Sequence, residues 1–222
     1  MQSIQDQGHG LVFHDAVSCL SVGPGGGELD ALLIANLMPK LERYVAIEPD
    51  TGNIKELVPR LIDALGDRKN FELHGGVVED VLDNVQGHFD VVLFIHVLYY
   101  IKDFKSLVER LKRLLRPGSK VLVALTKRSD LFTSLMKECG VKLWEGMEKS
   151  EQALKIHYPD MDIQCPITFG GTFNVKLMNV EALQIATGCF DVEELAVFKQ
   201  RAELRGIESF EYDVEIGMFT IS

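Results

Sequence analysis

Features that would place the chain in a membrane or a secretory pathway are missing from the sequence. No apolar run reaches the roughly 18 residues that a membrane-spanning helix needs. The N-terminus, MQSIQDQGHG, lacks the basic and then apolar pattern of a signal peptide. Positive charge is also scarce. The sequence has 23 Lys and Arg against 33 Asp and Glu, which gives a net charge of −10. Such a surface opposes unspecific binding to nucleic acid or anionic lipid, so we expect a soluble, cytoplasmic protein whose partners include neither nucleic acid nor a membrane.

Cysteine is scarce as well, and its positions fit neither a disulfide framework nor a metal site. The four cysteines are scattered without a C-x-x-C pair, and the six histidines are dispersed. No cysteine and histidine cluster at the spacing of a zinc site. We therefore interpret the cysteines as reduced and structural, and we expect no bound metal.

What the sequence does contain is a glycine-rich stretch, VSCLSVGPGGGELD, over residues 17–30. Small and β-favouring residues lead into Gly23, a turn with Gly25 and further glycines follows, and leucines at helical spacing begin at Leu29. This pattern predicts a strand, a glycine turn and a helix. A strand that ends in this way presents backbone N–H groups to a ligand lying across its end.

Glu48 stands at the end of a second apolar run, 44–47, where a carboxylate can accept hydrogen bonds from a ribose diol. The turn lacks the last glycine of the pyrophosphate pattern G-x-G-x-x-G and carries Glu28 and Asp30 instead, which suit a phosphate poorly. A ligand with a ribose and a cationic or zwitterionic end, such as S-adenosylmethionine, fits better. The alternative is a glycine turn that only packs a helix on a strand.

Apolar runs and helical patterns alternate five times along the first two thirds of the chain. After the first strand, further strands are predicted at Tyr44–Ile47, Phe71–His74, Phe89–Ile95 and Lys120–Thr126. Helices are predicted between them, at about 52–65, 103–115 and 129–139. This alternation predicts an α/β fold with a doubly wound, mostly parallel, Rossmann-like sheet whose ligand lies at the carboxyl ends of the strands.

Local signals add detail to this plan. Thr51 is a plausible cap of the second helix, Pro59 should kink that helix or mark its start, and Asp103 can cap the next one. Near the C-terminus, strands at about 163–169 and 210–221 predict an antiparallel closing pair, with helices at 180–186 and 192–205 inserted between them. Another helix is predicted at 149–156, and Gly170–Gly171 should interrupt the regular secondary structure.

The length and the hydrophobic content of 46% are enough for one substantial core. We therefore predict a single domain over 1–222. It comprises an N-terminal extension (1–16), a ligand-binding core (17–140), and a C-terminal hairpin with substrate-side helices (141–222).

Three stretches together resemble the class I S-adenosylmethionine-dependent methyltransferases, and most closely the histamine N-methyltransferases. They are LSVGPGGGELD (20–30), AIEPD (46–50) and FDVVLFIHVLYYIKD (89–103). The resemblance covers about 18–140 and is thin from 141 onward. It implies S-adenosyl-L-methionine as the cofactor and a small amine or imidazole-like molecule as the methyl acceptor.

The resemblance also implies roles for particular residues. Cofactor contacts are implied at Gly23, Glu48, Asn53, Val78 and Ile95, and Gly25 of the same glycine turn is a further candidate cofactor-binding residue. Acceptor contacts are implied at His96, Tyr99, Tyr100, Phe132 and Met136. Asn53 and Val78 depart from the family, which has a longer amide and a hydroxyl there. Phe132 and Met136 replace two tryptophans, which predicts a looser acceptor pocket.

His96 follows the central predicted strand, and its imidazole titrates near neutral pH, so it is our candidate for the base that keeps the acceptor neutral. A partly buried histidine bonded to backbone is the alternative, as core packing is for Phe132 and Met136. Two other functions stay open: methyl transfer to a non-amine or larger acceptor, and a non-catalytic relative that binds the nucleoside. The sequence does not indicate an oligomeric state.

Overall fold

The computed structural model describes residues 13–66, 70–128, 130–141, 164–177 and 191–220. Contacts between residues divide the chain into two compact units. The first comprises Met1–Ala124, Asp160–Ile167 and Ile216–Ser222, and the second comprises Leu125–Pro159 and Thr168–Glu215. Since two such units can belong to one domain, the single domain over 1–222 stays a prediction.

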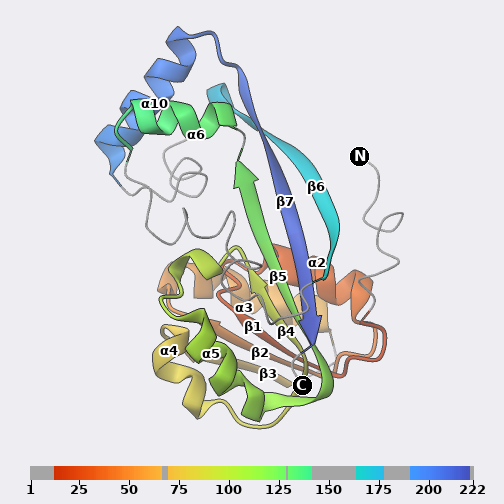
Figure 1. Cartoon of the computed structure of the whole chain (residues 1–222). Helices are drawn as coiled ribbons and strands as arrows, with labels where there is room; N and C mark the ends of the chain where they lie inside the picture. Colours follow the sequence, from red (N-terminus) through yellow and green to blue (C-terminus); the bar gives the residue numbers. More distant parts are fainter. Residues whose placement is uncertain (1–12, 67–69, 129, 142–163, 178–190, 221–222) are drawn as a thin grey trace. The chain divides into compact units, whose positions relative to one another are not determined.

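Within the described residues, seven strands form one sheet in the order β3-β2-β1-β4-β5-β7-β6. The strands are β1 (Ser18–Val22), β2 (Arg43–Glu48), β3 (Asn70–Gly75), β4 (Phe89–Ile95), β5 (Leu115–Arg128), β6 (Gln164–Asn174) and β7 (Ser209–Thr220). The first five pair in parallel, whereas β5 and its neighbour β7 run in opposite directions (Figure 1). The predicted fold class, a doubly wound, mostly parallel sheet with C-terminal antiparallel strands, is confirmed.

Helices connect these strands where the sequence pattern predicts them. They are α2 (Glu28–Leu37), α3 (Thr51–Leu65), α4 (Val78–Val81), α5 (Phe104–Leu111), α6 (Asp130–Glu138) and α10 (Val192–Leu204). Short 3-10 helices are η2 (Leu82–Asn84), η3 (Leu98–Tyr100), η4 (Lys112–Leu114) and η5 (Val175–Leu177). The helices predicted at 149–156 and 180–186 lie outside the described residues.

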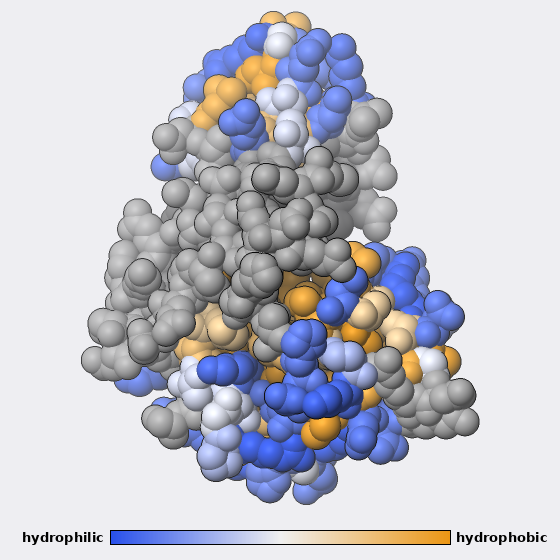
Figure 2. Space-filling model, turned by 90° about the vertical axis from the view of Figure 1, so that its right-hand side faces the viewer, coloured by the Kyte–Doolittle hydropathy of each residue, from blue (hydrophilic) through white to orange (hydrophobic). Residues whose placement is uncertain are grey.

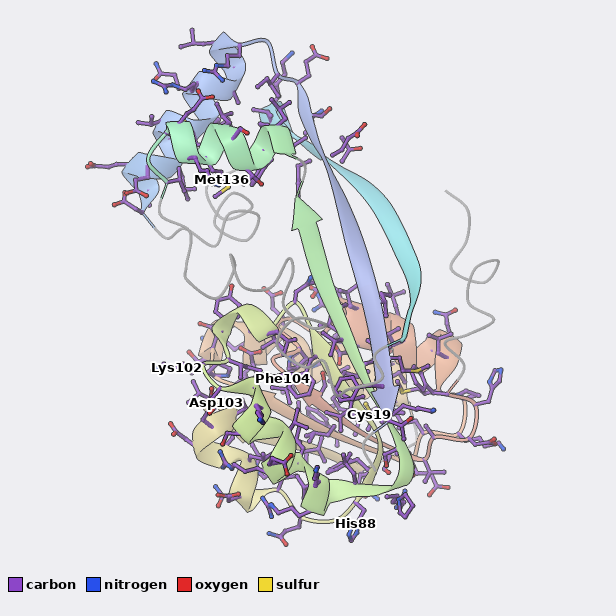
Figure 3. All side chains as sticks on the ribbon, viewed as in Figure 1. Cys19, His88, Lys102, Asp103, Phe104 and Met136 are labelled. Carbon is purple, nitrogen blue, oxygen red and sulfur yellow. The ribbon has the colours of Figure 1, made fainter. Side chains whose placement is uncertain are left out.

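The core of the first unit forms because β1, β2 and β4 are covered on both faces. Every residue of β1 is buried, and Val91–Phe94 of β4 is buried throughout, as expected for central parallel strands. Phe94 meets Phe104 edge to face, with 5.3 Å between ring centroids. Asp103, labelled in Figure 3, caps α5 by accepting a hydrogen bond from Ser106 N at 2.9 Å, as predicted.

Two local predictions, the cap at Thr51 and the break at Gly170–Gly171, were wrong, and one of the two alternatives for Pro59 is excluded. The cap of α3 is Asp50, whose Oδ1 accepts from Asn53 N at 2.8 Å, and Thr51 is the first helical residue. The helix runs through Pro59, so this proline does not mark its start. Strand β6 continues through Gly170–Gly171, because pairing within a sheet can hold glycines that are weak strand formers on their own.

The leucines of helix α2 do not all face the core. Leu29 and Leu32 are 46% and 54% exposed, whereas Asp30 and Ile34 are buried. Because α2 is apolar on nearly every side, the spacing of its leucines alone does not identify the buried face. Figure 2 views the molecule from the side on which α2 lies in Figure 1, and shows apolar residues interspersed with hydrophilic ones.

The second unit has an aromatic core of its own. Phe132 of α6 packs edge to face against Phe210 and Phe198, with centroids 4.9 Å and 5.2 Å away. Met136 is completely buried in the same cluster, and Figure 3 labels it on α6. Residues from α6, α10 and β7 therefore hold this unit together.

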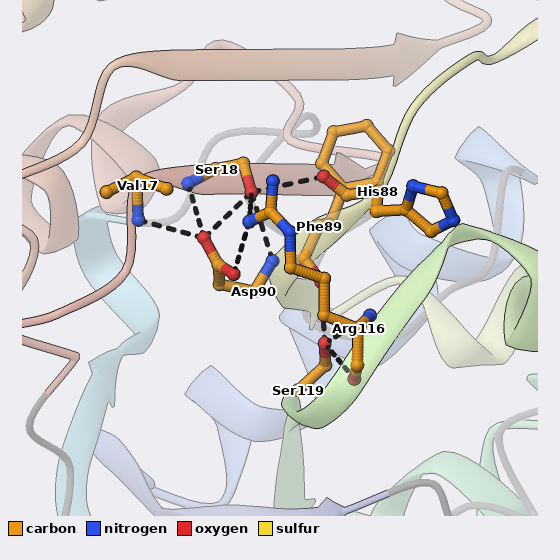
Figure 4. A network of polar contacts seen from close by, with 7 residues as sticks. All are labelled: Val17, Ser18, His88, Phe89, Asp90, Arg116 and Ser119. Atoms are coloured by element: carbon orange, nitrogen blue, oxygen red, sulfur yellow. Dashed lines mark hydrogen bonds and ion pairs between the residues drawn. The ribbon is translucent and has the colours of Figure 1, made fainter.

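A polar network joins the amino ends of β1, β4 and β5 (Figure 4). Asp90 Oδ2 accepts hydrogen bonds from Val17 N at 2.9 Å, Ser18 N at 2.9 Å and Ser18 Oγ at 2.8 Å. Arg116 Nη1 donates to Asp90 Oδ1 at 2.5 Å and to Ser18 Oγ at 3.0 Å. One carboxylate thus links three strands at their amino ends, away from the carboxyl ends.

Candidate active site

The order of the strands identifies the place where an open α/β sheet binds its ligand. From β1 the chain moves outward to β2 and β3, and then returns to place β4 on the other side of β1. The direction of winding therefore switches between β1 and β4, and ligands bind outside the carboxyl ends of strands at such a point. Gly23 directly follows β1, and His96 directly follows β4.

The glycine turn after β1 needs glycine for its backbone and for its contacts. Gly23, Gly25 and Gly27 have φ angles of 64°, 59° and 81°, in the left-handed region that favours glycine. A Cβ on Gly23 would overlap Val97 Cγ2, and one on Gly27 would lie 2.6 Å from Leu57 Cδ1. The turn therefore lies directly against the segment after β4 and against α3.

Glu48, the last residue of β2, is 4% exposed and faces this turn. Its Oε2 accepts a hydrogen bond from Gly25 N at 2.9 Å. Its Oε1 accepts from Asp50 N at 3.0 Å and from Asn53 Nδ2 at 3.3 Å. The structure thus brings together four of the predicted cofactor residues, since Gly23 N also donates to Ile47 O beside Glu48, at 2.8 Å.

The other two predicted cofactor residues lie at the carboxyl ends of β3 and β4. Gly76, just after β3, donates from its N–H to Glu48 O at 3.2 Å, and Val78 begins α4 two residues later. Val78 is buried, and Ile95 is half-buried as the last residue of β4. Their contact with a cofactor stays a prediction, although their positions agree with it.

His96 has an unusual backbone conformation. Its φ of 54° makes it the one non-glycine residue with a positive φ in the described part of the chain. Its N–H donates to Ala124 O at 2.9 Å, which links the end of β4 to β5. Burial lowers the pKa of the His96 imidazole below its ordinary value of 6.5, so the ring is neutral at physiological pH.

The predicted acceptor residues are spread over both units. Tyr99 and Tyr100 lie on η3 after β4, where Tyr100 is 41% exposed and the side chain of Tyr99 is outside the described set. Phe132 and Met136 belong to the core of the second unit. Core packing accounts for these last two side chains, and their role in an acceptor pocket stays a prediction.

Sequence reasoning missed one residue that contacts the glycine turn, Arg60 of α3. Arg60 Nη1 of α3 donates to Gly26 O and lies 2.7 Å from Glu28 Oε1. Asn53 and Arg60 are two helical turns apart and therefore lie on one face of α3. That spacing was a usable signal, but nothing in the sequence identifies a backbone carbonyl as the partner of an arginine.

The described residues provide neither a metal site nor a helix suited to a membrane. No group of three or more His, Cys, Asp or Glu side chains is arranged to hold a metal ion there. Among the helices of the same residues, none combines the length and the apolar character that crossing a membrane requires.

Comparisons with known proteins agree with this geometry. Histamine N-methyltransferase A of Xenopus laevis is 26% identical over 137 residues, which cover 57% of this chain and 47% of that protein. Histamine N-methyltransferase of Rattus norvegicus is 26% identical over 140 residues, with the same coverage. The chain thus spans about half the length of the curated relatives that it matches.

Solved structures share the fold over most of the chain. A putative methyltransferase from Bacillus halodurans has a TM-score of 0.63 at 15% identity and covers 100% of both chains. An S-adenosylmethionine-dependent methyltransferase from Thiobacillus denitrificans, solved with S-adenosyl-L-homocysteine, has a TM-score of 0.55 at 13% identity. It covers 92% of this chain and 85% of its own. The predicted cofactor is the one named for this structural relative.

A family model described as "Methyltransferase domain" matches residues 11–165, which include the glycine turn, Glu48 and the whole parallel part of the sheet. The match covers more than half of the chain and includes every cofactor residue named above. This protein therefore belongs to the methyltransferase-domain family.

Proposed function

We propose that this protein transfers a methyl group from S-adenosyl-L-methionine to a small amine or imidazole-like acceptor. The observation that carries the proposal is the bond between Glu48 Oε2 and Gly25 N. It places a buried carboxylate against the N–H groups of the turn, where a dinucleotide site holds its pyrophosphate. A second anion would be repelled there, whereas a neutral ribose diol finds an acceptor.

The residues present fit such a nucleoside. A carboxylate has about four lone-pair positions, and Glu48 uses three of them on Gly25, Asp50 and Asn53. A diol brings two donors, so one of the present bonds has to yield. The contact from Asn53 Nδ2, at 3.3 Å, is the longest of the three and is made by a side chain that can rotate. Gly23, Gly25, Glu48, Asn53, Val78 and Ile95 would hold the cofactor.

When bound, S-adenosylmethionine supplies an electrophilic methyl group on a sulfonium sulfur. The protein's task is to align an acceptor nitrogen with that methyl and to keep the nitrogen neutral. His96 directly follows β4, beside the point between β1 and β4 where the winding switches, and its lowered pKa leaves a neutral imidazole that can take up the proton. The amine acceptor is supported by the motifs shared with histamine N-methyltransferases.

Glu48→Ala is expected to weaken the binding of S-adenosylhomocysteine by about 1.5–3 kcal/mol, the range for hydrogen bonds to a charged group. It should also lower the free energy of unfolding by about 1–3 kcal/mol, because Gly25 N and Asp50 N lose their acceptor. Calorimetric titration and urea denaturation measure the two effects. Glu56→Ala, at an exposed position of α3, is the control that should change neither. Unchanged affinity in Glu48→Ala would contradict the ribose role.

His96→Asn is expected to keep the affinity for S-adenosylhomocysteine within a few fold and to lower methyl transfer about ten- to a thousandfold. Asparagine tolerates a positive φ at least as well as histidine, so the variant removes the imidazole with little added strain. His96→Ala removes the imidazole and adds backbone strain, so the pair separates the two effects. In the wild type, the rate should rise with pH through a pKa below 6.5, and this limb should vanish in His96→Asn. If His96→Asn transferred methyl groups at the wild-type rate, His96 would have a structural role only.

The acceptor is tested by incubating the protein with S-adenosylmethionine labelled in its methyl group and a panel of histamine, other biogenic amines and imidazole peptides. We expect transfer to at least one member of the panel. Cofactor binding without any transfer would contradict the amine assignment and favour a non-amine or larger acceptor, or a protein that only binds the nucleoside.

A further inference from the structure

Helix α3 presents one face to the glycine turn and to Glu48. Asn53, Leu57 and Arg60 follow each other at spacings of four and three residues, so they lie along the same side of the helix. Asn53 reaches Glu48, Leu57 fills the space beside Gly27, and Arg60 reaches Gly26 and Glu28. The helix that follows the ribose-binding carboxylate thus also supports the turn.

Arg60 makes two contacts with the turn. Its Nη1 donates to the carbonyl of Gly26 and pairs with Glu28 Oε1 at 2.7 Å. The neighbouring Gly25 N donates to Glu48. Adjacent residues of the turn are therefore held by two different elements, Gly25 by β2 and Gly26 by α3.

Holding this turn matters because it is rich in glycine. Glycine loses more conformational freedom on ordering than any other residue, so a free turn would have to be ordered when the ligand binds. A turn that is already held binds more tightly, since that cost has been met on folding. Residues 23–27 contain four glycines and one proline, so the gain is larger than at an ordinary turn.

We infer that Arg60 is a positioning residue for the cofactor turn, acting through Gly26 and Glu28 without touching the ligand. The inference rests on the proposed function, because it treats this turn as the one that receives the methionine end of S-adenosylmethionine. The Gly26 carbonyl is the more important of its two partners. The side chains of the ion pair are 35% and 59% exposed, and exposed ion pairs contribute little.

Three variants separate these contributions. Arg60→Ala removes both contacts, Arg60→Lys keeps a positive charge and a donor, and Glu28→Gln removes only the ion pair. Lys55→Ala is the matched control, because it removes a positive charge from an exposed position of the same helix. Each variant is compared with the wild type in thermal stability, in hydrogen exchange of the amides of Gly23 and residues 25–28 without ligand, and in affinity for S-adenosylhomocysteine.

For Arg60→Ala we expect faster exchange in the turn and a dissociation constant raised about 3- to 30-fold, at a melting temperature close to that of the wild type. Arg60→Lys should recover part of the affinity, whereas Glu28→Gln and Lys55→Ala should resemble the wild type. Wild-type exchange in the turn of Arg60→Ala would overturn the inference. So would an affinity loss in Lys55→Ala as large as in Arg60→Ala, because charge alone would then explain it.

The exchange measurement also separates this inference from the proposed function. If the wild type does not bind S-adenosylhomocysteine, the proposed function fails, while exchange in the ligand-free variants still decides whether Arg60 holds the turn. If the wild type binds and Arg60→Ala exchanges and binds as the wild type does, the proposed function stands and the inference about Arg60 fails.

Discussion

Replacing Gly23 by alanine is expected to lower the free energy of unfolding by about 2–5 kcal/mol and to weaken S-adenosylhomocysteine binding tenfold or more. An alanine at a φ of 64° is strained by about 1–2 kcal/mol. The new Cβ would also overlap Val97 Cγ2 and lie 3.1 Å from Val97 Cβ, which adds about 1–3 kcal/mol of overpacking. Val97 adjoins His96, so the displacement reaches the acceptor side of the site.

Gly25→Ala is the matched control for this prediction. Its φ of 59° is nearly the same as that of Gly23, but a Cβ there would meet nothing within 4 Å. Urea denaturation of the two variants should therefore differ by the overlap alone, about 1–3 kcal/mol. Equal losses of stability would contradict the close approach of the segment after β4 to the turn.

Asp90→Ala is expected to lower the free energy of unfolding by about 2–4 kcal/mol, without a direct effect on the cofactor site. The change removes the acceptor of two backbone N–H groups, one hydroxyl and Arg116 (Figure 4). The Asp90 side chain is 23% exposed, so water reaches some of the orphaned donors and keeps the loss at this level. Asp83→Ala is the control: Asp83 pairs with two arginines but is 67% exposed, and its loss should cost less than about 1 kcal/mol.

The pH dependence of stability tests the same network. Partial burial alone would raise the pKa of Asp90, but hydrogen bonds from Arg116, Ser18 and Val17 outweigh it and hold the pKa below its ordinary value of 3.8. A carboxylate with a depressed pKa contributes stability that is complete above about pH 4 and is lost as the pH falls through the folded-state value. The stabilities of the wild type and Asp90→Asn should therefore converge as the pH falls below the ordinary pKa of 3.8. A constant difference across this range would contradict the assigned role of the charge.

Much of the fold was predictable because a parallel strand that is buried on both faces has an almost continuous run of apolar residues. The run Phe89–Ile95 is almost wholly apolar, and it is the central strand that the pattern indicated. Asp90 interrupts that run, and its role was not predictable, because its partners are N–H groups of β1 that become neighbours only when strand register is known. The buried face of α2 was not predictable for a related reason, since the spacing of its leucines does not show which of them are buried.

The residues of the candidate site also differ in how far the sequence alone predicts them. The positions of Gly23 and Glu48 at strand ends were predictable from residue type and from the apolar runs before them, and their contact with a cofactor stays a prediction. Phe132 and Met136 were ambiguous, because a spacing of four residues on a helix is the same for a core residue and a pocket residue. Arg60 was not predicted at all, since its partner is a backbone carbonyl that no residue type marks.

The most direct test of the central claim is a calorimetric titration of the purified protein with S-adenosylhomocysteine and, separately, with NAD. The account predicts saturable one-to-one binding of S-adenosylhomocysteine and no binding of NAD, because Glu48 accepts from Gly25 N where a pyrophosphate would lie. Tight binding of NAD, or no binding of S-adenosylhomocysteine, would contradict it.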